Sequence, residues 1–498
     1  MTHLVHDILK DATDRWPDKV AIISERDAIT YGELEFQSAR VADLFTRMGV
    51  HKGDRVVFIL PNSIELVAAV FAASRIGAVF VVLSPQIKAF HLRHILEDAD
   101  PVVVVSLRQF AGRELTTNRR AWLTIDGDWS EQTIESPELK QAKISLSDPV
   151  CFIYTSGSSG KPRAVISTHA NVRFAAAAIQ EMLEYRGSDT VANFLPMSFD
   201  YGLYQAFLSF MVGATLALGT EKHVGAALAP KLEEWQVTVL PLSPIIAAML
   251  VRLLRRSNNA LPGLRAITNT GSHLPSVVIE DLRELLPGCD IYLMFGLTEC
   301  KRVSILPPED YSRKPNSVGR PLRDTQCLIV DEHGKRCALG MRGEPVVVGD
   351  HVMAGYWRSP ELSARRFRTW GPDHKRALFT GDVCSMDSDG YLYFHGRGDD
   401  IYKSRGFRVS TLEIELAARD ISGVLDAAAL PANAEGDAVL FVVSQIPKQD
   451  LMSGLHERLE DFKVPHSVEI LDSIPTNTNG KPDKGALRQL CGHGVGGT

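Results

Sequence analysis

Short runs of β-branched and aliphatic residues recur from the start of the chain to about residue 300, and segments of helical pattern separate them. The runs Val56–Leu60 and Val102–Val105 contain no charged residue, which is typical of strands buried on both faces. Ile29–Leu34 predicts the end of a strand and the start of a helix, with Thr30 and Glu33 at the spacing of a capping box. The same alternation continues through Val237–Leu240 and Ala266–Thr268. This order of elements predicts doubly wound, layered α/β subdomains.

After about residue 320 the pattern changes to short alternating strands separated by Gly and Asp turns, around Cys327–Val330, Glu344–Val348 and Tyr391–Phe394. This part predicts a small β-rich subdomain. A compact α+β segment follows from about residue 400.

The boundary between the large and the small domain is expected at the polar turn Arg397–Asp400. This turn is too short to be a loose tether but is suited to a hinge. We therefore expect an N-terminal domain of residues 1–397 and a mobile C-terminal domain of residues 398–498.

Composition limits the environment and the partners. The formal net charge of −6 gives no electrostatic reason to expect nucleic acid or an anionic membrane. The most apolar segment, Leu66–Leu83, contains Arg75 and Gly77, so it predicts a buried helix and strand rather than a membrane span. The N-terminus lacks the apolar core of a signal peptide, and the seven cysteines form no CxxC pair. These features favour a cytoplasmic protein with reduced thiols and neither structural zinc nor disulfides.

A loop rich in glycine and hydroxyl groups lies between two apolar runs, Val150–Tyr154 and Ala164–Ile166, that predict strands. Backbone N–H groups beside glycines, hydroxyls and cations together suit a polyphosphate. Only two residues separate the glycines, so the loop is not a Walker P-loop, and taken alone it could equally be a plain flexible turn. The loop consists of Thr155, Ser156, Gly157, Ser158, Ser159, Gly160 and Lys161.

Four further motifs follow this loop in a fixed order: Phe295–Glu299, Phe379–Asp382, Gly396–Phe407 and Asn479–Lys481. Together the five motifs resemble those of the adenylate-forming superfamily, which includes acyl-CoA synthetases, firefly-type luciferases and the adenylation enzymes of nonribosomal peptide synthesis. The resemblance extends over nearly the whole chain, and the chain resembles a free-standing adenylation enzyme.

The resemblance implies a set of ATP-binding residues. The loop Thr155–Lys161 would hold the β- and γ-phosphates. Phe295, where the family usually has Tyr, would stack on adenine, and the stretch that contains Gly271 and Ser272 would lie beside it. Asp382 and Arg397 would contact the ribose hydroxyls.

The resemblance also implies the catalytic residues. Thr298 would donate a hydrogen bond to the α-phosphate, and Glu299 would bind Mg²⁺. Lys481 would lie between the substrate carboxylate and the α-phosphate, where its charge offsets that of the transition state. Asp399 would be the hinge residue, and Gly406 would line the tunnel for a pantetheine thiol after the C-terminal domain rotates.

Two departures from the family pattern concern the phosphate loop. Arg163 and Ala164 stand where the family commonly has Lys-Gly, and Ser158-Ser159 replaces a Thr pair. The positive charge and the hydroxyls are kept, so we expect weakened rather than abolished phosphate handling.

The sequence leaves open which acid is activated, and two interpretations of Asp200 are possible. In the stretch Ser198-Phe199-Asp200, this residue stands where peptide-synthetase adenylation enzymes carry an aspartate that pairs with the α-ammonium of the amino acid. The same stretch resembles some acyl-CoA ligases, in which case Asp200 would be structural, as an N-cap of the helix from Tyr201. The amino-acid interpretation is slightly favoured.

Further pocket residues are expected around the Glu299 motif and Asp200. By family position some of Met294, Cys300, Lys301, Arg302 and Val303 would approach the acid, and Phe199, beside Asp200, is a further candidate. Tyr201 and Tyr204 would add aromatic walls. The aromatic rings favour a small or cyclic substrate, for which proline is one model. Arg302 would need an acidic partner if it points inward, either Asp200 or a second substrate carboxylate, and the commoner outcome is an exposed cation.

The sequence thus predicts an AMP-forming ligase with ATP, Mg²⁺ and a pantetheine thiol supplied in trans. The acceptor is a separate carrier protein or CoA, because a carrier domain of about 80 residues has no room after Lys481. An acyl-CoA synthetase acting on a non-amino acid is the alternative. A non-catalytic, ligase-like regulator is a further alternative.

Overall fold

The computed structural model describes residues 4–108, 121–124, 143–156, 162–256, 261–271, 274, 276–397, 401–404, 407–431, 438–475, 482 and 484–492. The chain divides into two compact units. The first consists of residues 1–85, 98–153 and 164–396, and the second of residues 86–97, 154–163 and 397–498. The second unit therefore includes two segments from the first third of the chain in addition to the C-terminal residues.

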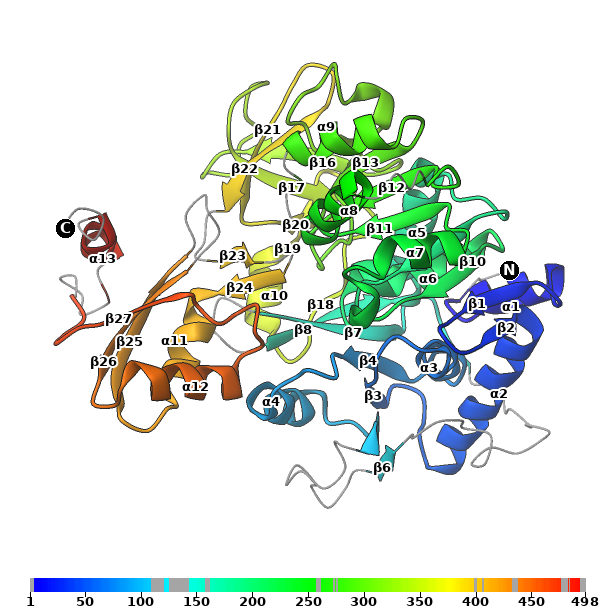
Figure 1. Cartoon of the computed structure of the whole chain (residues 1–498), viewed down its shortest axis with the longest axis horizontal. Helices are drawn as coiled ribbons and strands as arrows, with labels where there is room; N and C mark the ends of the chain where they lie inside the picture. The colour runs from blue at the N-terminus through cyan, green and yellow to red at the C-terminus, as the bar shows by residue number, and fades with distance from the viewer. Residues whose placement is uncertain are drawn as a thin grey trace. The chain divides into compact units, whose positions relative to one another are not determined.

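One sheet of the first unit is parallel at its centre and antiparallel at both edges (Figure 1). Its strands, in spatial order, are β15 (Arg320–Pro321), β14 (Ser304–Leu306), β13 (Asp290–Phe295), β12 (Ala266–Asn269), β11 (Val239–Leu242), β9 (Thr190–Asn193), β10 (Thr215–Leu218), β1 (Val20–Ile23) and β2 (Ala28–Thr30).

A second sheet is parallel from β7 to β6 and has the antiparallel strand β18 at the other edge. Its order is β18 (Gly355–Tyr356), β8 (Pro162–Thr168), β7 (Pro149–Ser156), β4 (Val79–Leu83), β3 (Arg55–Ile59), β5 (Val103–Ser106) and β6 (Ala121–Thr124). The central strands β4 and β5 are fully buried, and β3 is buried except at Arg55, as the apolar runs predict.

Helices cover these sheets, and two of them join the layers. Phe71 on α3 stacks on Phe210 of α6 with ring centroids 5.8 Å apart, and it meets Phe207 edge to face. The helices of the first unit are α1 (Asp7–Arg15), α2 (Tyr31–Arg47), α3 (Ile64–Arg75), α5 (His169–Leu183), α6 (Asp200–Met211), α7 (Leu228–Glu234), α8 (Pro244–Arg256), α9 (Ser276–Leu285) and α10 (Pro360–Arg366), with 3₁₀ turns η3 (Glu221–His223) and η4 (Pro308–Asp310).

The rest of the first unit is rich in short strands, as predicted. One antiparallel sheet has the order β16 (Gln326–Val330), β17 (Glu344–Val348), β20 (Lys375–Phe379) and β19 (Phe367–Trp370). A separate pair consists of β21 (Asp382–Met386) and β22 (Leu392–Arg397).

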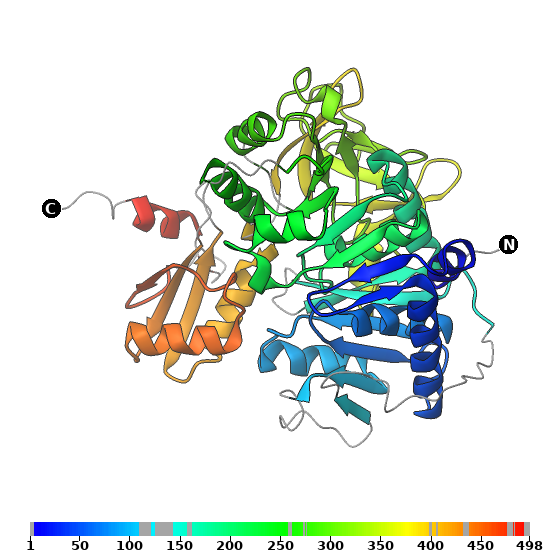
Figure 2. The same ribbon diagram turned by 45° about the vertical axis from the view of Figure 1, so that its right-hand side comes forward.

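The second unit contains a sheet covered on both faces. Alternate residues of its strands face two different cores: Ala427 and Leu440 pack with α11 and α12, whereas Ala428 and Phe441 pack with Leu487 of α13. Figure 2 shows α12 lying along one side of this sheet. The elements are α4 (Ala89–Ala99, whose last residues belong to the first unit), β23 (Ile401–Ser404), β24 (Phe407–Ser410), α11 (Thr411–Arg419), β25 (Val424–Leu430), β26 (Val439–Ser444), α12 (Lys448–Arg458), β27 (Ser467–Ile470) and α13 (Lys484–Gly492).

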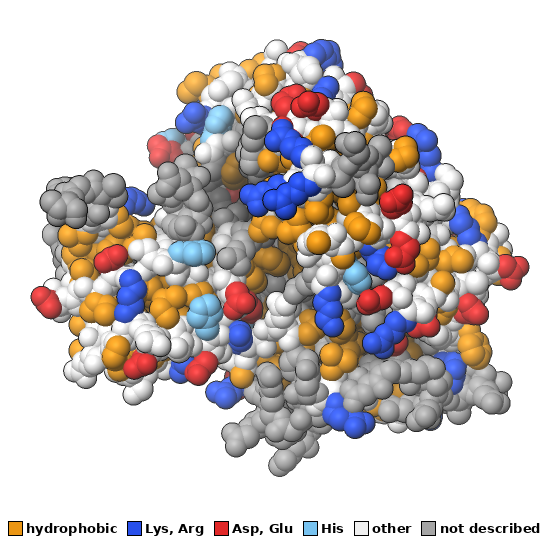
Figure 3. Space-filling view, viewed as in Figure 1, with side chains coloured by type: hydrophobic (Ala, Val, Ile, Leu, Met, Phe, Trp, Pro, Cys, Tyr) orange, Lys and Arg blue, Asp and Glu red, His pale blue; other side chains and the backbone are white. Residues whose placement is uncertain are grey.

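Several local predictions are confirmed. Thr30 and Glu33 form a capping box at the start of α2, and Leu66–Leu83 is the buried helix α3 followed by β4. All seven cysteines are free. Among the described residues, no helix combines the length and the apolar character needed to cross a membrane. On the face shown in Figure 3, acidic and basic side chains are interspersed.

Candidate active site

The predicted acid-binding and adenine-binding residues of the first unit gather at one edge of the sheet that contains β9, β11, β12 and β13. These strands are parallel, so their carboxyl ends meet at the same edge. Ligands of open α/β sheets bind outside the carboxyl ends of the strands. The loop after β9 leads to Asp200, the residues after β12 include Gly271, and Phe295 is the last residue of β13.

The turn from Gly296 to Val303 is folded tightly after β13. A Cβ atom on Gly296 would lie 2.0 Å from the carbonyl oxygen of Lys301, so only glycine fits there. Lys301 itself has a left-handed backbone with φ of 63°, and the Val303 N–H donates to the Phe295 carbonyl at 2.8 Å. This fold buries the side chains of four consecutive polar or thiol residues, Glu299, Cys300, Lys301 and Arg302.

Glu299 is only 2% exposed. Its Oε1 accepts a hydrogen bond of 2.8 Å from the hydroxyl of Tyr356 on β18, and its carbonyl accepts from the Met353 N–H at 2.9 Å. The neighbouring Thr298 is also buried. A fixed carboxylate beside a hydroxyl offers the oxygen donors that Mg²⁺ prefers, so these residues fit the ion.

The start of α6 is held in place by the residues that precede and follow it. The side chain of Asn62 donates to the Leu195 carbonyl at 2.8 Å and accepts from the Met197 N–H at 2.9 Å. Gly202 allows close packing, since a Cβ atom there would lie 2.5 Å from the carbonyl oxygen of Pro196. Asp200 is therefore placed by a rigid turn.

Asp200 is the first residue of α6, and Phe199 occupies the N-cap position with an extended backbone. The interpretation of Asp200 as an N-cap is therefore wrong. Its carboxylate is buried instead of bonding the helix end, and its Oδ2 lies 3.7 Å from Nζ of Lys301.

Two cations and two tyrosines surround this carboxylate. Lys301 Nζ lies 5.6 Å from the ring centroid of Tyr204, and the guanidinium of Arg302 lies 5.0 Å from that of Tyr201. Arg302 is 6% exposed, so the commoner outcome, an outward cation, is wrong for this residue. Tyr201 is fixed by its hydroxyl, which donates to the Thr268 carbonyl at 2.7 Å.

Burial dominates the electrostatics of this cluster. It lowers the pKa of Arg302, an effect that the charge of Asp200 opposes. Burial likewise raises the pKa of Tyr204 well above its usual value, so its hydroxyl keeps its proton. The buried thiol of Cys151 has a pKa raised to about 12 by burial and is no nucleophile at neutral pH.

The remaining predicted residues of the first unit are Phe295, Met294, Gly271 and Asp382. Phe295 is buried, and its ring lies 5.3 Å from that of Phe394. Met294 is buried on β13, and Gly271 has a φ of 89°. Asp382 is buried at the start of β21, where its N–H donates to Thr380 Oγ1 at 3.2 Å.

Other predicted residues lie in the second unit or outside the described residues. Thr155 and Ser156 end β7, and Arg397 ends β22; all three belong to the second unit. The residues outside the described part of the chain are Gly157, Ser158, Ser159, Gly160, Lys161, Ser272, Asp399, Gly406 and Lys481.

Two residues that shape this site, Asn62 and Tyr356, were not predicted from the sequence. They lie far from every motif in the chain, and no local pattern marks them as neighbours of the site. Lys301 was among the residues of which some were expected near the acid, and the structure buries it beside Asp200.

The second unit contains another buried group of ionisable residues. His91 Nε2 lies 3.0 Å from Glu413 Oε1, and His91 Nδ1 lies 3.4 Å from Glu460 Oε1. The spacing of these three ligand atoms would suit a metal ion. However, Lys463 Nζ lies 2.7 Å from Glu413 and 2.9 Å from Glu460, so an ammonium already pairs with both carboxylates. The two carboxylates also raise the pKa of His91, against the effect of burial. The cluster is therefore an ion-pair network.

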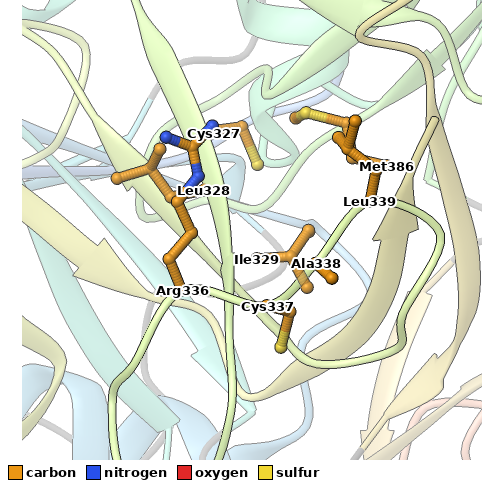
Figure 4. A pocket seen from close by; sticks show the side chains of 8 residues that line it. All are labelled: Cys327, Leu328, Ile329, Arg336, Cys337, Ala338, Leu339 and Met386. Carbon is orange, nitrogen blue, oxygen red and sulfur yellow. The ribbon is translucent and has the colours of Figure 1, made fainter. Parts of the chain in front are cut away.

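A small pocket in the β-rich part of the first unit is separate from the residues discussed above. It lies between β16, the segment of residues 336–339 and Met386 (Figure 4). Its lining is mostly apolar and includes Cys327, Ile329 and Leu339. No residue predicted for nucleotide or acid binding lines it, so it does not bear on the chemistry.

Comparison with known proteins agrees with the geometry. Residues 9–357 match the family model described as AMP-binding enzyme, so the chain belongs to this family. The chain is an adenylate-forming enzyme with the mixed α/β fold of that superfamily.

Individual relatives are peptide-synthesis and carrier-loading proteins. The chain is 29% identical over 97% of its length to delta-poly-L-ornithine synthetase of Acinetobacter baumannii, of which it spans only 36%. It is 28% identical to L-proline--[L-prolyl-carrier protein] ligase of Pseudomonas fluorescens, with 98% of this chain and 100% of that protein covered. The crystal structure of VinN matches 79% of this chain and 99% of its own with 38% identity and a TM-score of 0.73.

Proposed function

We propose that this enzyme activates a small amino acid with ATP as the aminoacyl-AMP, releases pyrophosphate, and transfers the aminoacyl group to the pantetheine thiol of a separate carrier protein. The observation that carries the amino-acid part is Asp200. Its carboxylate is buried in the first unit, it does not cap α6, and its nearest cation lies beyond hydrogen-bond distance. A buried carboxylate whose paired cation lies 3.7 Å away is suited to a closer contact with an ammonium group.

In the first half-reaction, an oxygen of the substrate carboxylate attacks the α-phosphorus and pyrophosphate leaves. Thr298 would donate to the α-phosphate, and Glu299, fixed by Tyr356, would hold Mg²⁺, which offsets the phosphate charge. Phe295 would stack on adenine, with Gly271 and Ser272 beside it, while Asp382 and Arg397 would bind the ribose. Lys481 would bring a positive charge between the two reacting anions.

In the second half-reaction, the thiolate attacks the carbonyl carbon of the adenylate and AMP leaves. We propose that residues 398–498 rotate about Asp399 between the two steps, so that Lys481 serves the first and Gly406 the second. The phosphates would be held by the loop from Thr155 to Lys161.

The relatives support this choice of substrate and acceptor. One acts on proline and a prolyl carrier protein, another is named for polyornithine synthesis, and VinN has a structure in complex with L-aspartate at 37% identity to this chain. All three names or titles refer to amino acids. An acyl-CoA synthetase acting on a simple acid is the competing function.

ATP–pyrophosphate exchange tests the proposal. We expect exchange with one amino acid, at least about 100-fold weaker exchange with the same acid lacking the amine, and loss of this preference in Asp200→Ala. Asp43→Ala is the matched control, because Asp43 is a buried carboxylate that pairs with Arg47 on α2. Exchange with simple acids that is indifferent to the amine, followed by transfer to CoA, would instead establish the competing function.

A further inference from the structure

The charges buried beside Asp200 do not balance. Among the described residues, Asp200 is the one carboxylate that pairs with Lys301, and neither Lys301 nor Arg302 has another acidic partner. The cluster therefore combines one negative and two positive charges, a net charge of +1. A buried cation without a counter-charge is costly, so a stable fold does not place two there without a reason.

The polar atoms of the cluster are also left without partners. Lys301 is 2% exposed, yet its Nζ makes no hydrogen bond to any residue that the structure describes, and the same holds for Nε of Arg302. Within the same part of the chain, the hydroxyl of Tyr204, which is 3% exposed, is likewise unpartnered. Buried donors are normally satisfied, so three unsatisfied donors in one place indicate a missing acceptor.

The positions of these donors agree with a single binding region. Asp200 and Tyr204 are one helical turn apart on α6, and Lys301 Nζ contacts both of them. The guanidinium of Arg302 lies over the ring of Tyr201, which is between Asp200 and Tyr204 in the sequence. Its NH1 group donates a hydrogen bond to the Lys301 carbonyl. Tyr201 is anchored on β12 through Thr268, so the cations are held against a rigid wall.

We propose that Lys301 and Arg302, with the Tyr204 hydroxyl, bind a second carboxylate of the substrate, so that the enzyme activates an acidic amino acid. This inference rests on the proposed function, because it assigns the side-chain subsite of the same acid pocket. The substrate ammonium pairs with Asp200, one carboxylate reacts with ATP, and the other meets the two cations. An acidic amino acid has a net charge of −1 and brings the sum of charges in the pocket to zero.

The test separates the two carboxylates and the amine. ATP–pyrophosphate exchange and calorimetric binding in the presence of Mg-ATP are measured with aspartate, glutamate, both monoamides of each, and the corresponding compounds without an amine: succinate, glutarate, succinamate and glutaramate. We expect one dicarboxylate to exceed its monoamide by at least about 100-fold in kcat/KM. Whether exchange depends on the amine tests the proposed function. Whether it depends on the second carboxylate tests this subsite.

The variants Lys301→Met and Arg302→Met assign the effect to the two cations. We expect each to reduce the preference for carboxylate over amide to less than about tenfold, mainly through KM, while the KM for ATP stays unchanged. Arg302→Lys, which keeps the charge, restores part of the preference and remains informative if the methionine variants fold poorly. Arg252→Met, on the exposed face of α8, is the control.

Three results would overturn the subsite. One is exchange or binding that favours neutral amino acids over dicarboxylates. Another is a rise in the KM for ATP in both variants with all acids equally, which would make the cations phosphate ligands. The third is the absence of any preference for a carboxylate in both exchange and calorimetry.

Discussion

The turn between β13 and β14 shows how much of this site depends on one missing side chain. Gly296→Ala would force a Cβ atom against the backbone of Lys301, and backbone cannot yield as a flexible side chain does. We expect the free energy of unfolding to fall by about 1–3 kcal/mol and the exchange activity to be largely lost, because Glu299 and Arg302 would shift.

Chemical denaturation and pyrophosphate exchange check this prediction. Gly263→Ala is the matched control, since its nearest neighbour would lie 3.7 Å away. Equal effects of the two substitutions would contradict the argument.

The hydroxyl of Tyr356 supports Glu299 from an edge strand that is far away in sequence. Tyr356→Phe removes the 2.8 Å hydrogen bond and leaves the buried carboxylate with one partner fewer. If Glu299 holds Mg²⁺, we expect the ion concentration for half-maximal exchange to rise about 10- to 100-fold.

A titration of exchange activity with Mg²⁺ measures the effect of Tyr356→Phe. Tyr393→Phe removes a comparable hydrogen bond of 3.1 Å to Asp387 and is expected to leave the Mg²⁺ dependence unchanged. An unaltered Mg²⁺ requirement in Tyr356→Phe would argue against Glu299 as the ligand or against this support.

The elements themselves were largely predictable, whereas the contacts between them were not. The apolar runs identified β3 and β5, and the capping box identified the start of α2, because these signals are local. The orientation of Arg302 depends on a turn that Gly296 closes and on Tyr201 from another element. Such long-range packing leaves no periodic pattern in the sequence. An exposed Arg302 was therefore the commoner expectation, and it was wrong.

At the level of elements, the ion network of the second unit joins α4 to α11 and to the segment that follows α12, and it makes that unit sensitive to pH. Burial opposes protonation of His91, but its interactions with Glu413 and Glu460 outweigh this effect and raise its pKa. Burial likewise opposes ionisation of Glu460, yet His91 and Lys463 lower its pKa to about 2.

The two shifts define a window of greatest stability. The contribution of Glu460 is present above its unfolded pKa near 4.5 and is lost as the pH falls towards 2. The contribution of His91 is present below its unfolded pKa near 6.5 and is lost as the pH rises through its raised folded value. We therefore expect the network to be most stable between about pH 4.5 and 6.5.

Hydrogen exchange of peptides from α4 and α11 measures this dependence between pH 5 and 9. In the wild-type protein we expect protection, corrected for the intrinsic exchange rate, to decline at the alkaline end of this range. In His91→Gln we expect this decline to be absent. His333→Gln is the control, because that side chain is 81% exposed. A decline that persists in His91→Gln would assign it to another group.

At the scale of the whole molecule, the second unit combines residues 397–498 with two segments from the first third of the chain, one of which carries Thr155. The fold class could be predicted because alternation and motif order extend through the sequence. The composition of the second unit could not, since the membership of residues 86–97 and 154–163 depends on tertiary contacts such as that of His91 with Glu413.

The proposed division of labour between the two half-reactions gives the sharpest test of the molecule as a whole. Lys481→Ala removes the cation that would lie between the reacting carboxylate and the α-phosphate. We expect pyrophosphate exchange to fall by about 100-fold or more, because that charge acts only where two anions meet. Thioester formation from a chemically prepared aminoacyl-AMP has no such encounter, and we expect its rate to stay within about threefold of the wild type. Lys448→Ala, at an exposed position of α12, controls for the loss of a surface charge. Equal loss of both half-reactions would assign Lys481 to the fold or to carrier binding, and equal survival would remove it from the chemistry.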